Sequence, residues 1–246
     1  MPSNIPQSID DTLALLSGEN YVADRSLATV LYLSLKMQRP LFLEGEAGVG
    51  KTEIAKVLSN ALDRPLIRLQ CYEGLDESRA LYEWKYGKQL LYTQLLRDKL
   101  GGMLADTDSL EASMDRLGDL GEAFYSETFL EPRPLLHALR SDEPAVLLID
   151  EIDKADQEFE AFLLELLSDF QISTPELGTV KAKHQPLVLL TSNDQRELSD
   201  ALKRRCLHLY IPYPEAELEA NIVAARVPDL DVRLREQLVA FIQYLR

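Results

Sequence analysis

The chain is poor in cysteine and has no long apolar run, and both shortages exclude classes of protein. Its 246 residues include two cysteines, Cys71 and Cys206, with no Cys-x-x-Cys spacing. Two cysteines in a chain of this length build neither a disulfide framework nor a zinc site, so we expect free thiols in a reducing cytoplasm. No apolar run approaches the roughly 18 residues that suggest a membrane span. Residues 1–11 also lack the basic start and apolar core of a signal peptide.

Positive charge is scarce as well. The 26 lysines and arginines are outnumbered by 41 aspartates and glutamates, and the formal net charge is −15. Since nucleic-acid phosphates are bound by basic faces, this balance argues against a nucleic-acid partner. Residues 104–131 alone contain eight acidic residues and one basic residue, a net of −7. Such a segment is either a solvated helical surface or an acidic docking face for a partner protein.

Short apolar runs alternate with amphipathic segments over most of the chain. Runs typical of buried strands lie at 41–43, 65–70, 145–149, 187–190 and 207–211. Helical periodicity marks 24–38, 53–62, 134–139 and 159–170. The clearest helix carries its apolar side chains at Phe159, Phe162, Leu163, Leu166, Leu167 and Phe170. This alternation predicts an α/β fold with a mostly parallel five-stranded sheet between helices.

Three segments lie between these elements. Residues 171–184, with turn-forming residues at 175–178, predict a β-hairpin. The acidic segment 104–131 is expected to be helical. Residues 72–97 are rich in aromatic and charged side chains and follow no clear pattern.

The end of the chain changes in character. Two helices with no strand between them are expected at 215–225 and 232–245. We therefore divide the chain into an α/β core at 1–212 and the beginning of a helical subdomain at 213–246, which we expect to be incomplete.

A phosphate-binding loop follows the first apolar run. The pattern G-x-x-x-x-G-K-[ST] is matched at every fixed position by Gly45-Glu46-Ala47-Gly48-Val49-Gly50-Lys51-Thr52. A strand is expected before this loop and a helix after it, so backbone N–H groups and the helix N-terminus would face phosphate oxygens. Lys51 would reach the β- and γ-phosphates of ATP, and Thr52 would hold Mg²⁺ through its hydroxyl.

Two carboxylates end the third apolar run. Asp150 and Glu151 directly follow residues 145–149, and the carboxyl ends of parallel strands are where such sheets bind ligands. We expect Asp150 to position Mg²⁺ in the nucleotide site, directly or through water. Glu151 would polarise the attacking water as the general base.

Polar residues also follow the fourth apolar run. Asn193 could orient the water or touch the γ-phosphate, although Ser-Asn-Asp is also ordinary turn chemistry. Lys203-Arg204-Arg205 follows about ten residues later. An arginine supplied to a neighbour's nucleotide stabilises transition-state charge, and the simpler alternative is a solvated basic cluster.

Taken in order, these motifs resemble AAA+ ATPases of the MoxR type. The resemblance covers nearly the whole chain and rests on residues 43–52, 148–155, 159–170, 190–193, 201–206 and 213–214. Residues 70–76 and 80–84 are similar to the branch associated with maturation of carbon monoxide dehydrogenase. The resemblance implies a P-loop NTPase (AAA+) core at 1–212, followed by the start of a helical lid at 213–246.

The resemblance also implies roles for individual residues. Asn193 would be the first sensor. Arg205, which spacing favours, or else Arg204 would be an arginine finger that acts on a neighbouring subunit, in a homo-oligomeric ring that is usually a hexamer. The segments 72–97 and 171–184 would face the ring pore or a partner. The family's second sensor arginine has no convincing match in this sequence.

For function, the resemblance implies that ATP hydrolysis drives chaperone-like remodelling of a client protein. Such proteins often act with a von Willebrand A domain partner and insert metal cofactors into a metalloenzyme client. Two alternatives stay open: a nucleotide-dependent scaffold with little turnover, and a DNA-acting AAA+ motor. A GTPase is disfavoured because the chain has no Asn-Lys-x-Asp motif. Glu151 favours water over a phosphoryl acceptor, which disfavours a kinase.

Overall fold

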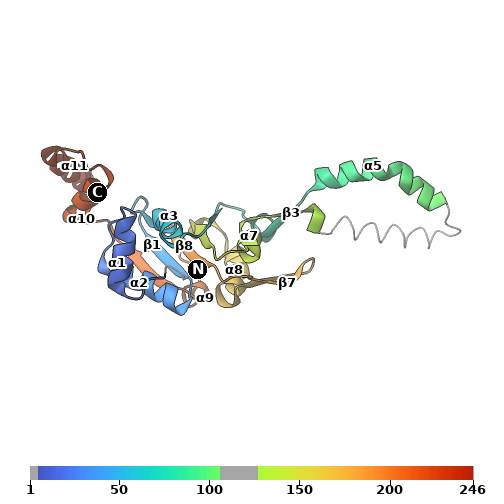
Figure 1. Ribbon diagram of the computed structural model, residues 1–246, viewed down its shortest axis with the longest axis horizontal. Coiled ribbons are helices and arrows are strands. Elements are labelled where there is room, and N and C mark those ends of the chain that lie inside the picture. The colour runs from blue at the N-terminus through green and yellow to red at the C-terminus, as the bar shows by residue number, and fades with distance from the viewer. Residues whose placement is uncertain (1–4, 106–126, 246) are drawn as a thin grey trace.

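The centre of the protein is a five-stranded parallel sheet, seen in a computed structural model that describes residues 5–105 and 127–245 (Figure 1). The strands are β1 (Leu41–Gly45), β2 (Leu66–Gln70), β5 (Val146–Asp150), β8 (Leu187–Ser192) and β9 (Leu207–Ile211). Their order across the sheet is β2-β5-β8-β1-β9, and every neighbouring pair is parallel. The predicted α/β fold with five core strands is therefore confirmed.

Helices cover both faces of this sheet. One face packs against α1 (Ile9–Gly18), α2 (Arg25–Met37) and α3 (Lys51–Leu62). The other packs against α7 (Pro134–Arg140), α8 (Gln157–Asp169) and α9 (Asp200–Lys203). Successive strand residues point to opposite faces. Accordingly, Leu148 of β5 belongs to the core on the side of α1, α2 and α3, and Ile149 belongs to the core on the side of α7, α8 and α9.

Local signals set the ends of the amphipathic helices. The side chain of Asp24 caps α2 by accepting a hydrogen bond from the backbone N–H of Leu27. Asp156 caps α8 in the same way through Phe159 N–H. Each cap satisfies a backbone donor that the first turn of a helix leaves unpaired. The clearest predicted helix thus begins at its cap and presents its apolar face to the sheet.

The predicted hairpin is present as β6 (Gln171–Thr174) and β7 (Gly178–Lys181), which pair in antiparallel fashion directly after α8. Residues 72–97, which showed no clear pattern, contain α4 (Glu77–Leu81), β3 (Tyr82–Trp84) and the first part of α5 (Tyr86–Ala105). Figure 1 shows α5 projecting away from the sheet.

The expectation of a helix over 104–131 is wrong at its far end, and residues 106–126 lie outside the described part of the chain. The 3₁₀ turn η1 (Glu127–Phe129) leads into β4 (Leu130–Pro132), which pairs with β3. Leu130 lies opposite Trp84 and is buried. Burial of this side chain between strands outweighs the local preference for helix.

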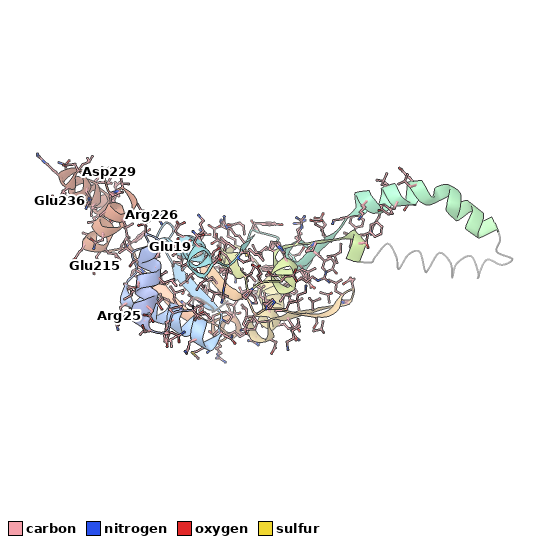
Figure 2. All side chains as sticks on the ribbon, in the orientation of Figure 1. Glu19, Arg25, Glu215, Arg226, Asp229 and Glu236 are labelled. Atoms are coloured by element: carbon pink, nitrogen blue, oxygen red, sulfur yellow. The ribbon has the colours of Figure 1, made fainter. Side chains whose placement is uncertain are left out.

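The chain closes with α10 (Ala216–Arg226) and α11 (Val232–Leu245), which lie beyond one end of the sheet (Figure 1). Arg226, labelled in Figure 2, donates a hydrogen bond of 3.0 Å from Nη2 to Oε1 of Glu53 in α3. This contact joins the terminal helices to the helix behind the phosphate loop. Among residues 5–105 and 127–245, no helix is both long and apolar enough to cross a bilayer.

We predict that Leu189→Ala lowers the free energy of unfolding by about 2–5 kcal/mol, because Leu189 is fully buried in the central strand β8 and its truncation leaves a cavity. Urea titration followed by circular dichroism measures the loss. The matched control is Leu234→Ala in α11, where the side chain is 52% exposed, and we expect a change within about 0.5 kcal/mol. Equal losses in both variants would contradict the described core.

Candidate functional site

The phosphate loop lies between β1 and α3 and is shaped by its glycines. A Cβ atom on Gly45 would clash with the backbone carbonyl of Ile211 in the neighbouring strand β9, so only glycine fits there. Gly50 caps α3 with a left-handed backbone (φ 96°), which glycine adopts without steric cost. The two glycines let the chain leave β1 close to β9 and turn directly into α3, with the helix N-terminus facing the loop.

Lys51 holds this loop together. Its ammonium group donates hydrogen bonds of 2.7 Å to the carbonyl oxygens of Gly45 and of Glu46. The residue is only 5% exposed. Burial lowers the pKa of Lys51, and the nearby carboxylates, of which Asp153 contributes most, oppose that shift. The ammonium group predicted to bind phosphate is thus hydrogen-bonded to carbonyl oxygens of the loop itself.

Asp150 is the most heavily bonded carboxylate of the site. It ends β5 and is 1% exposed. Its Oδ1 accepts hydrogen bonds from the hydroxyls of Thr52 (2.9 Å) and Thr191 (2.5 Å). Its Oδ2 accepts from the guanidinium of Arg68, at 2.6 Å from Nη2 and 3.0 Å from Nε. The two residues predicted to bind Mg²⁺ are thus in direct contact.

The donor set around Asp150 fits Mg²⁺. This ion prefers hard oxygen ligands, usually one or two from the protein together with water and phosphate oxygens. The Thr52 hydroxyl and the Asp150 carboxylate are oxygens of this kind at the edge of the phosphate loop. Thr52 and Asp150 are therefore the residues that would hold the ion.

Sequence reasoning missed Thr191 and Arg68. Thr191 falls within 190–193, one of the stretches that carry the family resemblance, but no role was predicted for it, and Arg68 lies inside β2 in no recognisable motif. Both reach Asp150 because β2 and β8 flank β5 in the sheet. The available signal was a polar residue inside the run 65–70 (Arg68) and directly after the run 187–190 (Thr191), but strand order was needed to interpret it.

Glu151 stands on a strained backbone beside Asp150. Its φ of 57° lies in the left-handed region, which is unusual for a residue other than glycine. Its backbone N–H donates to the Thr191 hydroxyl at 2.9 Å. Its carboxylate accepts from Gln70 Nε2 (2.8 Å), Lys154 Nζ (2.5 Å) and, over a longer distance of 3.4 Å, Asn193 Nδ2. The predicted base and the predicted sensor therefore meet.

Two adjoining cavities surround these groups. The smaller, about 290 Å³, lies between the phosphate loop, Asp150, Glu151, Thr191 and Asn193. The larger, about 810 Å³, shares the loop backbone at Gly48 and Gly50, and extends between residues 20–27, the end of β9 and α10. The smaller cavity gathers the carboxylates, the hydroxyls and Asn193, and the larger offers additional volume next to it.

The two candidate arginines lie elsewhere. They directly precede β9 at the amino ends of the parallel strands, whereas the phosphate loop is at the carboxyl ends. Arg205 donates hydrogen bonds from Nε to the Ser168 hydroxyl (2.6 Å) and from Nη1 to the Ala201 carbonyl (2.8 Å). The Arg204 side chain is 82% exposed. Neither arginine lines the two cavities of its own chain.

Comparison with known proteins agrees with this geometry. The sequence model of the family described as "ATPase family associated with various cellular activities (AAA)" matches residues 41–213. This range begins with β1 and ends just beyond β9, and it therefore includes every strand of the central sheet.

Individual relatives are more distant. The chain is 27% identical to the gas vesicle ATPase GvpN of Haloferax mediterranei over 86% of its own length and 58% of that protein's. It is 24% identical to an uncharacterized protein of Staphylococcus aureus, over 85% of this chain and 69% of that protein. A crystal structure from Cytophaga hutchinsonii, whose description proposes an ATPase, has a TM-score of 0.58 at 17% identity. The match covers 91% of this chain and 56% of the chain in that structure. The chain thus spans less than two thirds of the gas vesicle protein.

We predict that Thr191→Val destabilises the protein by about 1–3 kcal/mol, since the variant removes one of the two hydroxyls that donate to Asp150 Oδ1 and leaves the Glu151 N–H without its acceptor. Thermal unfolding without nucleotide measures the effect. Thr191→Ser is the matched control because it keeps the hydroxyl, and it should recover most of the loss. A valine variant as stable as the serine variant would argue against these hydrogen bonds.

Proposed function

Because this chain belongs to the AAA family of ATPases, we propose that it binds Mg-ATP and hydrolyses it to ADP and phosphate. The observation that carries the proposal is the meeting of Thr52, Asp150, Glu151 and Asn193 in one cavity beside the phosphate loop. These are a metal-binding pair, a base and a polar sensor at the carboxyl ends of parallel strands, where such sheets bind their ligands.

Phosphate binding uses the loop and Lys51. The loop's N–H groups and the N-terminus of α3 attract anions. The Lys51 ammonium now bonds the Gly45 and Glu46 carbonyls and would exchange them for phosphate oxygens. Mg²⁺, held by Thr52 and Asp150, would supply charge neutralisation at the β- and γ-phosphates.

Glu151 acts as the general base in this proposal, with Asn193 orienting the water. Both oxygens of its carboxylate are already engaged, by Gln70 and Lys154 on one side and Asn193 on the other. Proton transfer from water requires at least one of these contacts to open. The same contacts favour low basal turnover, which keeps the alternative of a nucleotide-dependent scaffold open.

The larger cavity is the proposed place of the nucleoside. It continues from Gly48 and Gly50, and Tyr21 and Arg226 line it. Burial, together with Asp24 and Glu53, raises the pKa of Tyr21 to about 12, so its hydroxyl stays protonated and able to donate a hydrogen bond. A bound base and ribose would therefore contact residues of the first helices and of α10 together.

We place an arginine finger on Arg204 or Arg205, acting between subunits. Both lie at the edge of the sheet opposite their own phosphate loop, so they can serve only a neighbour's nucleotide. Spacing favours Arg205, which would have to leave Ser168 and Ala201. The exposed side chain of Arg204 favours that residue instead, because it can reach a neighbouring subunit without leaving internal partners of this kind. A finger in trans implies a homo-oligomer, and the family resemblance makes a hexameric ring the first candidate.

The biological role proposed here rests on the MoxR resemblance, with residues 70–76 and 80–84 favouring the branch linked to carbon monoxide dehydrogenase. ATP hydrolysis would drive remodelling of a client protein in the cytoplasm, such as metal insertion into an enzyme. A von Willebrand A domain protein would be the partner. The net charge of −15 supports a protein partner over DNA.

Lys51→Ala and Glu151→Gln should separate binding from hydrolysis. We predict that Lys51→Ala abolishes ATP binding, because it removes the cation of the phosphate loop. Glu151→Gln should keep binding and lose phosphate release by at least about 10²-fold, the range of a missing general base. Calorimetry and a phosphate-release assay check the two. Tight binding by the alanine variant, or undiminished release by the glutamine variant, would contradict the assigned roles.

Phosphate release per chain should rise with protein concentration, because the active site is completed between subunits. A mixture of Lys51→Ala, whose finger is intact, with Arg205→Ala, whose phosphate loop is intact, should recover activity that both variants lack alone. The expected loss without the finger is about 10³-fold or more. Recovery with Arg204→Ala instead would move the finger to that residue. A rate per chain independent of concentration, without recovery in either mixture, would exclude action in trans.

A further inference from the structure

We propose that Asp153 is a positioning residue for ATP hydrolysis: its carboxylate fixes the turn that carries Asn193 against Glu151. The inference rests on the proposed ATPase function and assigns a role to a residue outside the metal, base and phosphate sets. Asp153 lies in the 3₁₀ turn η2 (Ile152–Lys154), two residues after Glu151, and is 5% exposed.

One oxygen of Asp153 holds both sides of the sensor turn. Oδ2 accepts hydrogen bonds from the backbone N–H of Asn193 (3.1 Å) and of Gln195 (3.2 Å). A carboxylate that receives two backbone donors is a strong and directional anchor. Because Asp153 and Glu151 share one short turn, the anchor fixes Asn193 relative to the proposed base.

The turn needs such an anchor. Asp194, between the two bonded amides, has a φ of 58°, which costs conformational energy in a residue other than glycine. Its N–H is taken by the Ser192 hydroxyl at 3.0 Å. Glu151, on the opposing segment, has a φ of 57°. Glu151 and Asp194 thus both have left-handed backbone conformations, and the hydrogen bonds of Asp153 connect the turn after β5 to the turn after β8.

An ion pair with one buried partner secures the far end of the same turn. Arg196 donates from Nη2 to the Ala155 carbonyl (2.7 Å) and pairs through Nη1 with Oε1 of Glu160 (2.5 Å). Glu160 belongs to α8, is 1% exposed, and its Oε2 accepts from Ser199 N–H at 2.9 Å. The residues after Asn193 are therefore tied to α8 as well. Truncating Arg196 would leave the buried Glu160 carboxylate unpaired and endanger folding, so Asp153 is the better residue to test.

A competing role for Asp153 is electrostatic. Its Oδ1 is buried without a hydrogen-bond partner in the described part of the chain, and its charge partly offsets the lowering of the Lys51 pKa by burial. If this charge were what matters, Asp153 would act on phosphate binding through Lys51. The two roles differ in what they require: a correctly placed acceptor oxygen, or a negative charge.

Two substitutions separate these requirements. Asp153→Asn keeps an acceptor oxygen in place and removes the charge, whereas Asp153→Glu keeps the charge and moves the oxygen by one methylene. We expect Asp153→Asn to retain at least about half of the wild-type kcat. We expect Asp153→Glu to lose about tenfold to hundredfold in kcat, as misplacement of a reacting group by about 1 Å does. The affinity for ATP should stay within about twofold in both, because the phosphate loop is untouched.

The decisive measurement is a double-mutant cycle with Asn193→Ala. If Asp153 acts through Asn193, Asp153→Glu should cause no further loss of kcat in the Asn193→Ala background. An equal fold-loss in both backgrounds, or an Asp153→Asn variant as inactive as Asp153→Glu, would overturn the proposal. If Asp153→Glu does not fold, Asp153→Asn decides alone, since its inactivity is sufficient to reject the acceptor role.

Backbone hydrogen exchange makes the test independent of hydrolysis. The amides of Asn193 and Gln195 should stay protected in Asp153→Asn and exchange faster in Asp153→Glu, without nucleotide. Unchanged protection in Asp153→Glu would reject the anchoring. A wild-type protein that releases no phosphate from Mg-ATP would reject the proposed ATPase function, and the exchange result would still show whether Asp153 holds the turn.

Discussion

The buried carboxylate of Asp150 connects three neighbouring strands to the helix behind the phosphate loop. It receives Arg68 from β2, Thr191 from β8 and Thr52 from α3, while it ends β5 itself. A buried carboxylate without partners would cost several kcal/mol. The positions of the surrounding strand ends are therefore constrained by this one group, and the candidate site is built outward from it.

Strained backbone surrounds this centre and is held by polar contacts. Glu151 has a left-handed conformation with its N–H on Thr191, and Asp194 has one between two amides bonded by Asp153. The Lys51 ammonium donates to two carbonyl oxygens of the phosphate loop. The candidate site residues are therefore in place, with most of them bonded to one another. Nucleotide binding would exchange these internal partners for ligand atoms.

Several parts of this arrangement could be predicted because they depend on neighbours in the sequence. The core strands, the helix after the phosphate loop and the hairpin after α8 follow from apolar periodicity and turn residues. The expectation for 127–131 was wrong because Leu130 is buried opposite Trp84, more than 40 residues away in the chain. Such pairing has no local signal, since helix propensity is weak compared with burial.

By itself, the sequence determined the phosphate loop, the acidic pair after β5 and the α/β class, because each depends on spacing within a single strand–turn–helix unit. The tertiary structure alone decided which side chains complete the site. Arg68 and Thr191 reach Asp150 because the strand order β2-β5-β8 brings residues 82 and 41 positions away onto one carboxylate. Asp153 reaches the turn of Asn193 for the same reason. Strand order is set by the packing of the whole core on both faces of the sheet, and no local pattern contains it.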